Sequence, residues 1–220
     1  MTIFERALQW VRPGDSVGLG SGRAASAFVR VLASSGISVR CVATSTATAA
    51  LAESLGLALV ELESAMPLAL MVDGADEIDP QGNAIKGYGR ALIREKIVAC
   101  VSQRLILVAG TTKRVERLGS RGRLPVEIVP FGLPLFRRWA EQQGHRFTVD
   151  NSRTENGNVA GDLLIGPLEK PHELEEQLRA VPGVVGTGLF LQLASVVLFG
   201  DESRDFELVQ ELTFDRGGAV

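Results

Sequence analysis

The sequence predicts an α/β protein with a mostly parallel sheet and a second, smaller α+β unit. In the first half of the chain, apolar runs of strand length alternate with helical patterns. These runs are continuously apolar, which is typical of parallel strands that are covered on both faces. Near residues 120–125 the pattern changes to shorter strands, which follow a β-α-β-β-α order.

The first half of the chain accounts for the predicted parallel sheet. Its first residues, MTIFERALQWVRPG, have the pattern of an amphipathic helix and lack the basic and apolar segments of a signal peptide. Strand–helix alternation after this segment favours a doubly wound sheet. Strands are expected at residues 16–19, 39–43, 57–62, 68–72 and 105–109, and helices at residues 24–33, 47–55 and 91–101.

The second half of the chain predicts the smaller unit. Strands are expected at residues 125–128, 146–150 and 158–165, and helices at residues 133–143 and 171–180. A strand at residues 195–199 and the acidic tail can return to the first sheet. We therefore expect one domain from residues 1–124 and 193–220, and a small α+β domain from residues 125–192.

Composition restricts the class of partner. The net charge of -3 and the lack of a basic run give no reason to expect binding to nucleic acid or to a membrane surface. No apolar run approaches the roughly 20 residues that cross a bilayer. Cys41 and Cys100 are the only cysteines, without a CxxC motif or nearby histidines, so neither a disulfide scaffold nor a zinc site is expected. We expect a cytoplasmic protein.

The glycine-rich segment GLGSGRAA, residues 18–25, connects the first predicted strand to the first predicted helix. Its G-x-G-x-x-A spacing formally matches a dinucleotide fingerprint. The acid that this fingerprint needs about 20 residues later is missing, since that position holds the hydroxyl residues 44–46. A dinucleotide is therefore disfavoured. Two interpretations remain, an anion site at a helix N-terminus and a tight turn packed against the sheet.

Residues 70–99, LMVDGADEIDPQGNAIKGYGRALIREKIVA, contain most of the chemically reactive side chains. Asp73 follows a predicted strand and so lies at a carboxyl end, where open α/β sheets bind ligands. Asp76 comes after a sharp turn that Gly74 permits. Asp79, in the sequence DPQG, is better explained as part of a solvated turn. The spacing of these acids does not match a calcium loop, so a metal is not favoured.

Lys86 and Glu95 complete a set of groups that can move protons. The chain has four lysines and otherwise uses arginine, so Lys86 beside two glycines indicates a need for a compact ammonium. Glu95 lies on a mostly apolar helix face, where desolvation would raise its pKa toward that of a useful general base. An ion pair at the helix edge is the alternative for Glu95. Arg94 and Lys96 are expected on a solvated flank.

Long, specific motifs extend over most of the chain. They are VGLGSG near the start, DGADEIDPQGNAIKGYGRALIREKIVA, AGTTKRVERLG around Lys113, LPVEIVPF at residues 124–131, ENGNVAGDL at 155–163 and VPGVVGTGLF at 181–190. In this order they resemble the motifs of type A ribose-5-phosphate isomerase. The resemblance implies a Rossmann-like sheet domain that binds sugar phosphate, a smaller α+β domain, and a homodimer or homotetramer.

The resemblance also implies a reaction, the interconversion of ribose 5-phosphate and ribulose 5-phosphate through an enediol, without metal or cofactor. Glu95 would move the proton between C2 and C1. Asp73 and Asp76 would handle hydroxyl protons, and Lys86 with nearby amides would stabilise the oxyanion. The implied substrate-binding residues are Ser21, Gly22, Arg23, Ala24, Gly74, Ala75, Gly87, Tyr88, Gly89 and Lys113.

The chain departs from the family's pattern around the phosphate. Arg23 and Ala24 replace two hydroxyl residues, Tyr88 and Arg90 stand in a turn that is usually glycine and alanine, and Gly110 replaces an aspartate. A lysine of the family's N-terminal helix has no counterpart. Arg23 or Arg90 could replace that lysine, or Tyr88 and Arg23 could narrow the pocket. An active isomerase is favoured over a non-catalytic sugar-phosphate-binding protein and over an isomerase of another sugar phosphate.

Overall fold

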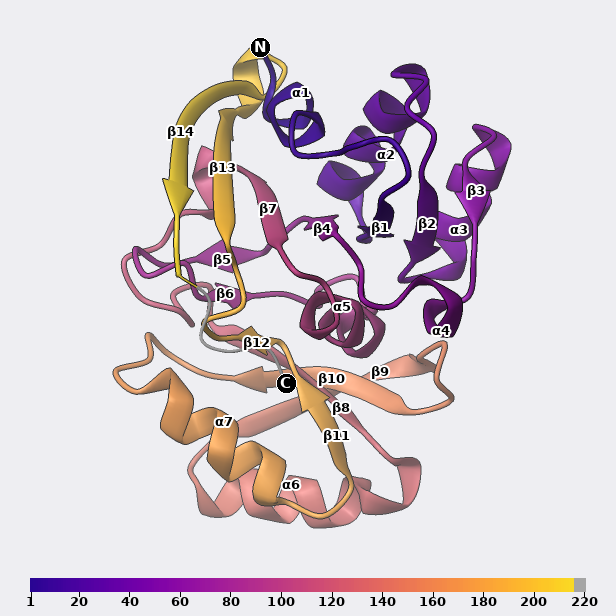
Figure 1. The fold of residues 1–220 in the computed structure, drawn as a ribbon. Helices are drawn as coiled ribbons and strands as arrows, with labels where there is room; N and C mark the ends of the chain where they lie inside the picture. Colours follow the sequence, from indigo (N-terminus) through magenta and orange to yellow (C-terminus); the bar gives the residue numbers. More distant parts are fainter. Residues whose placement is uncertain (216–220) are drawn as a thin grey trace.

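A seven-stranded sheet organises the larger part of the computed structural model, which describes residues 1–215 (Figure 1). Residues 216–220 of the predicted first domain lie outside the described residues. The strand order is β14-β13-β7-β4-β1-β2-β3, and β14 alone among these strands is antiparallel to its neighbour. The strands are β1 (Ser16–Leu19), β2 (Arg40–Ala43), β3 (Ala58–Leu59), β4 (Leu70–Asp73), β7 (Leu105–Gly110), β13 (Val196–Asp201) and β14 (Glu207–Thr213).

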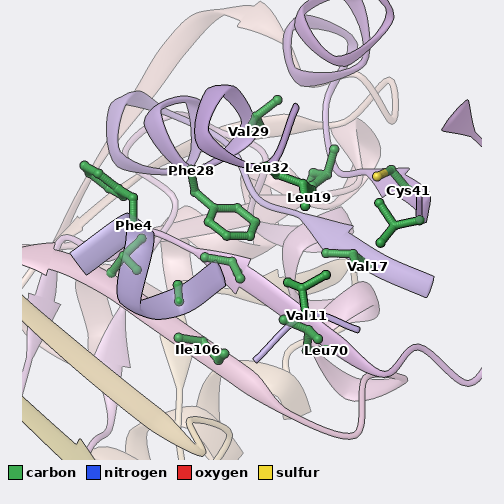
Figure 2. Packing of buried hydrophobic residues seen from close by; sticks show 14 of the residues in the cluster. Phe4, Val11, Val17, Leu19, Phe28, Val29, Leu32, Cys41, Leu70 and Ile106 are labelled. Atoms are coloured by element: carbon green, nitrogen blue, oxygen red, sulfur yellow. The ribbon is translucent and has the colours of Figure 1, made fainter. Parts of the chain in front are cut away.

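Helices cover both faces of this sheet. On one face, Phe28 and Leu32 of α2 pack over Val17 and Leu70 of the strands (Figure 2). On the other face, Met71 packs in a second cluster with residues of α5. Because both faces are buried, the strands are continuously apolar, and the predicted mostly parallel sheet is confirmed. The helices are α1 (Ile3–Leu8), α2 (Arg23–Ser34), α3 (Thr46–Ser54), α4 (Leu62–Ala65) and α5 (Leu92–Cys100).

A four-stranded antiparallel sheet forms the smaller part of the molecule. Its order is β11-β8-β10-β9, and Figure 1 shows α6 and α7 on the side of this sheet that faces away from the larger one. Helix α5 contacts β4 as well as β8 and β11, so it lies between the two sheets. The elements are β8 (Arg123–Ile128), α6 (Leu133–Gln142), β9 (Arg146–Arg153), β10 (Val159–Leu164), α7 (Pro171–Ala180) and β11 (Val184–Thr187). We propose that this part forms the small domain expected at residues 125–192.

A three-stranded sheet made of very short strands lies between these two parts. It consists of β5 (Glu77–Ile78), β6 (Ala84–Ile85) and β12 (Leu189–Phe190), in the order β12-β6-β5. The sequence analysis missed these strands, because two residues are too few to produce a periodic pattern. Lys86 follows β6 directly, so this sheet determines where its side chain begins.

One other segment differs from the predicted elements. The strand expected at residues 57–62 is the two-residue strand β3, and α4 begins at Leu62. The expected return to the larger sheet is confirmed, since β13 pairs with β7 and β14 pairs with β13. Short 3-10 helices occupy Thr111–Lys113, Pro130–Gly132 and Glu202–Arg204. Within residues 1–215, none of the helices has the length and apolar character needed to cross a bilayer.

Candidate active site

The site lies where the strand order changes direction, between β1 and β4. From β1 the chain continues outward to β2 and β3, then returns to β4 on the other side of β1. Ligands of open α/β sheets bind outside the carboxyl ends of strands at such a point. The amide of Gly20 donates to the carbonyl of Val72 across the two strand ends, at 3.0 Å. The site therefore begins with the β1–α2 loop and Asp73.

Gly20 has a packing reason to be glycine. A Cβ added there would lie 2.0 Å from Oδ1 of Asp73. The same oxygen accepts hydrogen bonds from the amide of Ser21 at 3.2 Å and from the amide of Gly74 at 2.7 Å. The close approach of the glycine loop thus fixes the orientation of the Asp73 carboxylate.

A cavity of about 340 Å³ opens at this point, within the size range of small-molecule sites. The lining residues come from the segments after β1 and β4, the end of β7 and the 3-10 helix after it, the segment after β6, helix α5 and the β13–β14 connection. They are Ser21, Gly22, Arg23, Ala24, Gly74, Ala75, Asp76, Lys86, Gly87, Gly89, Glu95, Val108, Ala109, Gly110, Lys113, Glu202 and Phe206. Most of the predicted site residues therefore surround one cavity. Asp73 and Tyr88 are not among the lining residues.

Three charged side chains meet at the inner end of the cavity. Nζ of Lys86 lies 2.8 Å from Oδ2 of Asp73 and 3.2 Å from Oε2 of Glu95. The same ammonium donates to the carbonyl of Gly74 at 2.6 Å. The side chains of Asp73, Lys86 and Glu95 are 0%, 3% and 6% exposed. Asp73 lies behind Lys86, whereas Lys86 and Glu95 reach the cavity.

Glu95 is the group in this cluster that can accept a proton near neutral pH. Burial raises its pKa to about 7, and the negative charge of Asp73 adds to this rise, while Lys86 opposes it. Although Lys86 is close, Oε2 of Glu95 is buried and accepts no hydrogen bond of good geometry from residues 1–215. A carboxylate that lines a cavity and has a pKa near neutral is suited to general base catalysis.

Lys86 keeps its charge despite being buried. Burial acts to lower its pKa, but the negative charges of Asp73 and Glu95 outweigh this effect and raise the pKa above its ordinary value. An ammonium held in a desolvated site is a strong stabiliser of negative charge that develops nearby. The alternative interpretation of Glu95 was an ion pair at the helix edge. Glu95 does form an ion pair, but its partner is Lys86, which also lines the cavity.

Asp76 provides a second carboxylate on the cavity wall. Its Oδ2 accepts a hydrogen bond from the amide of Tyr88 at 3.0 Å. The backbone of the segment after β6 therefore orients Asp76. Asp76 lines the cavity, whereas Asp73 is fully buried and does not, so the two acids have different environments.

The outer end of the cavity is suited to an anion. Helix α2 begins there, after Gly22, whose φ of +88° favours glycine, and no side chain caps its first amides. Uncapped amides at a helix N-terminus attract anions. Arg23, with its side chain 82% exposed, and Lys113 add positive charge at the same end. Among the interpretations of the glycine loop, the anion site is the one this geometry favours.

Glu202 and Phe206 line the cavity, and the sequence analysis did not identify them. They follow β13, and their place beside residues 21–24 and 110–113 depends on the pairing of β13 with β7. Glu202 lies 3.2 Å from the guanidinium of Arg23 and accepts a hydrogen bond from the hydroxyl of Thr112. A Cβ added at Gly110 would lie 2.3 Å from the Glu202 carboxyl carbon, so glycine at 110 leaves room for this acid.

Tyr88 and Arg90 point away from the cavity. The Tyr88 ring lies 3.6 Å from the guanidinium carbon of Arg123, and Arg90 pairs with Asp150 and Asp162 of the antiparallel sheet. Tyr88 therefore does not narrow the pocket, and Arg90 is not free to replace the family's missing lysine.

Two smaller expectations need comment. The prediction that Lys96 lies on a solvated flank is wrong. Its Nζ lies 3.3 Å from Glu175 and 5.1 Å from the centre of the Phe190 ring, and burial lowers its pKa. Asp79 forms the expected turn by accepting from the amides of Gln81 and Asn83, but it is buried and not solvated.

Neither cysteine lines the cavity. Cys41 is buried, and burial raises its thiol pKa to about 11, whereas Cys100 is half-buried. Among residues 1–215, no three histidine, cysteine, aspartate or glutamate side chains come together in an arrangement that could hold a metal ion.

The family model and the most similar curated relatives indicate the same protein family. The family model described as ribose 5-phosphate isomerase A (phosphoriboisomerase A) matches residues 40–204. The chain is 43% identical to a ribose-5-phosphate isomerase A of Roseiflexus castenholzii, over 93% of this chain and 92% of the relative. It is 42% identical to the protein of that name from Gloeobacter violaceus, over 91% of each.

Solved structures agree with the sequence relatives. The crystal structure of ribose 5 phosphate isomerase A from Neisseria gonorrhoeae is similar, with a TM-score of 0.89 and 29% identity, over 96% of this chain and 93% of that one. A D-ribose-5-phosphate isomerase in complex with phospho-erythronic acid has a TM-score of 0.90 and 26% identity, over 96% and 95% of the two chains.

Proposed function

We propose how this chain, which belongs to the ribose 5-phosphate isomerase A family, interconverts ribose 5-phosphate and ribulose 5-phosphate. In this proposal Glu95 is the base that moves the proton between C2 and C1. One observation carries this proposal. Glu95 lines the cavity with a pKa of about 7 and lies 3.2 Å from the buried Lys86. A base and a cation that lie side by side in a desolvated site can remove a proton and stabilise the negative charge that develops as it leaves.

The proposed reaction begins at C2 of the open-chain aldose. Glu95 removes the C2 proton while negative charge develops on O1 of the aldehyde, and the Lys86 ammonium stabilises this charge. Protonation of O1 gives the enediol. Loss of the O2 proton and return of the Glu95 proton to C1 then give the ketose. One proton has moved from C2 to C1 and one from O2 to O1, so the reaction is balanced.

The two aspartates have separate proposed roles. Asp76 lines the cavity and is the proposed carrier of hydroxyl protons, in ring opening and between O2 and O1. Asp73 lies behind Lys86 at 2.8 Å, with no exposed surface, so we assign it the task of holding the ammonium and keeping its charge. This assignment refines the expectation from the resemblance, in which both aspartates handled hydroxyl protons.

The phosphate is proposed to bind at the outer end of the cavity. The uncapped amides at the start of α2, the ammonium of Lys113 and the guanidinium of Arg23 support an anion there. The sugar would then extend inward past Gly74 and Gly87 to Lys86. The other predicted binding residues that line the cavity are Ser21, Gly22, Ala24, Ala75 and Gly89.

The test is a direct assay of the purified chain with ribose 5-phosphate, in parallel with Glu95→Gln. The wild type is expected to form ribulose 5-phosphate, and the variant is expected to bind the sugar phosphate without forming it. A folded wild-type protein that binds ribose 5-phosphate without turnover would favour the non-catalytic hypothesis. Turnover of a different pentose or hexose phosphate in place of ribose 5-phosphate would favour the third hypothesis.

We also propose a cytoplasmic homodimer or homotetramer. Apolar side chains near the end of β8 support a contact between copies, since Phe131 is 95% exposed and Val129 and Val185 are 43% and 42% exposed. Light scattering should give twice or four times the mass of one chain, and Phe131→Glu should lower it. A monomer at micromolar concentration would contradict this proposal.

A further inference from the structure

We propose that Arg90 is a positioning residue for the isomerase reaction. In this proposal its guanidinium fastens the cavity-lining segment 87–90 to the antiparallel sheet. This inference rests on the proposed function, because it concerns the same reaction. It goes beyond that function in assigning a task to a residue whose side chain does not reach the substrate cavity.

The guanidinium of Arg90 binds two carboxylates at once. Its Nε and Nη2 donate to Asp150 at 2.5 and 3.0 Å, and its Nη1 and Nη2 donate to Asp162 at 2.7 and 3.0 Å. Asp150 lies on β9 and Asp162 on β10, and the Asp162 side chain is 10% exposed. Paired charge-assisted bonds of this kind fix direction as well as distance. Arg90 is therefore held to two neighbouring strands of the antiparallel sheet.

The backbone of Arg90 supports the same conclusion. Its φ is +66°, in the left-handed region that residues other than glycine seldom occupy. Its amide donates to the carbonyl of Gly87 at 3.0 Å, which closes the turn 87–90. Burial acts to lower the pKa of Arg90, but hydrogen bonds to Asp162 and Asp150 outweigh it and raise the pKa. An unfavourable backbone conformation is thus kept because the side chain is held in two places.

The anchored turn contributes directly to the reaction site. Gly87 and Gly89 line the cavity with backbone alone, between Lys86 and Glu95 in the sequence. The amide of Tyr88 holds Oδ2 of Asp76 at 3.0 Å. A shift of the turn would therefore move the cavity wall and the Asp76 carboxylate together.

Arg90 also adjoins the helix that carries the proposed base. The next residue, Ala91, precedes α5, and its carbonyl accepts the amide of Glu95 at 3.0 Å. The first turn of α5 therefore continues directly from the anchored residue. Loss of the anchor is expected to change the placement of Glu95 as well as that of Asp76.

A second contact strengthens the anchor. The guanidinium of Arg123 lies over the Tyr88 ring, and its Nη1 is 3.4 Å from Oδ2 of Asp162. Arg90 binds Asp162 directly, whereas Tyr88 contacts Arg123, which in turn binds Asp162. Both side chains of the turn therefore contact residues of the antiparallel sheet.

Arg94 provides a matched control for Arg90. It comes from the same stretch of chain and pairs with Glu155 at 2.9 Å, between the ends of β9 and β10. It does not line the substrate cavity, and its side chain is 43% exposed. If a link to the antiparallel sheet mattered only for stability, Arg90 and Arg94 variants would affect the reaction alike.

The experiment compares Arg90→Gly and Arg94→Ala with the wild type by steady-state kinetics and thermal unfolding. Glycine accepts a positive φ, so Arg90→Gly removes the anchor without adding backbone strain. We expect its kcat to fall about 10- to 100-fold, because a displacement of about 1 Å can cost this much, with KM changed by less than about threefold. Arg94→Ala should keep both constants within about twofold of the wild type.

A double variant, Asp150→Asn with Asp162→Asn, tests the same anchor from the opposite side and leaves the turn sequence intact. It should also lower kcat at temperatures well below its unfolding midpoint. The proposal is overturned if a folded Arg90→Gly protein keeps wild-type kcat, if only KM changes, or if Arg94→Ala loses as much kcat. A wild-type chain without turnover would instead contradict the proposed function.

Discussion

The two ends of the cavity are built in opposite ways. At the inner end, Asp73, Lys86 and Glu95 are almost completely buried, and the Lys86 ammonium lies 2.8 Å from Asp73 and 3.2 Å from Glu95. At the outer end, the Arg23 side chain is 82% exposed, and its contact with Glu202 is a surface ion pair. The inner end holds the proposed proton-transfer groups, and the outer end holds the proposed phosphate site.

This difference affects how much a substitution at each end is expected to cost. The charged side chains at the inner end are buried and paired with one another. Removal of one leaves its partner buried without a counter-charge, which strongly destabilises the folded protein. Exposed charges are screened by water, and their replacement changes the free energy little. Substitution of Arg23 is therefore expected to cost little stability, and substitution of Asp73, Lys86 or Glu95 much more.

The largest expected effect is that of Glu95→Gln at the inner end. The amide keeps the shape of the side chain and cannot accept the C2 proton, so kcat should fall at least about 100-fold. Binding of ribose 5-phosphate, measured by calorimetry, should stay within a few-fold of the wild type. A kcat within tenfold of the wild type would remove Glu95 from the base role and weaken the comparison between the two ends.

Gly20→Ala is expected to have the next largest effect. The added Cβ would lie 2.0 Å from Oδ1 of Asp73, so the carboxylate must move and its contact with Lys86 must change. Overpacking of this kind costs about 1–3 kcal/mol, and the unfolding midpoint should fall by several degrees together with kcat. Gly166→Ala is a matched control, since neither Gly20 nor Gly166 has a positive φ and no atom lies within 4 Å of a Cβ added at Gly166. If Gly20→Ala kept the unfolding midpoint and the kcat of Gly166→Ala, the close packing around Asp73 would not matter.

The pH dependence of kcat/KM gives an intermediate and quantitative test. Glu95 acts as a base only when it is ionised, and its pKa in the free protein is raised to about 7. Below this pH the ionised fraction falls, so kcat/KM should fall about tenfold per pH unit and level off above it. A carboxyl with an ordinary pKa of about 4.3 would instead keep kcat/KM constant down to about pH 5. A profile without an inflection between pH 6 and 8 would contradict the assignment.

Arg23→Ala should produce the smallest effect, confined to the outer end. KM is expected to rise about threefold to tenfold with kcat unchanged, because one charged contact to the phosphate is lost. Since a cation in the first turn of a helix opposes the helix dipole, the unfolding midpoint should stay the same or rise slightly. Arg30→Ala, on an exposed position of the same helix, should change neither constant. An unchanged KM for Arg23→Ala would exclude Arg23 from phosphate binding.

Much of the fold follows from the sequence, because parallel strands buried on both faces produce long apolar runs. The predicted strand at residues 105–109 corresponds to Leu105–Gly110, and the predicted helix at 91–101 to Leu92–Cys100. The two-residue strands around Lys86 were missed, because their pairing is decided by distant residues such as Leu189 and Phe190. Short strands have no pattern of their own.

The site residues that come from one continuous segment of the chain could be predicted from the sequence. Asp76, Lys86 and Glu95 come from one segment and do line one cavity. Glu202 could not be found in this way, since β-pairing brings it from more than 100 residues away. The solvated flank assigned to Lys96 was wrong for a similar reason, because helical periodicity does not reveal that Glu175 of another helix packs against it.

The most direct test of the account is the fate of the C2 proton of ribose 5-phosphate in D2O, followed by proton NMR. The central claim is that Glu95 removes this proton. The wild type should consume the C2–H signal as ribulose 5-phosphate forms, and Glu95→Gln, which keeps the cavity and the anion end, should leave the signal unchanged over the same period. Loss of the C2–H signal at a wild-type rate in Glu95→Gln would contradict the claim.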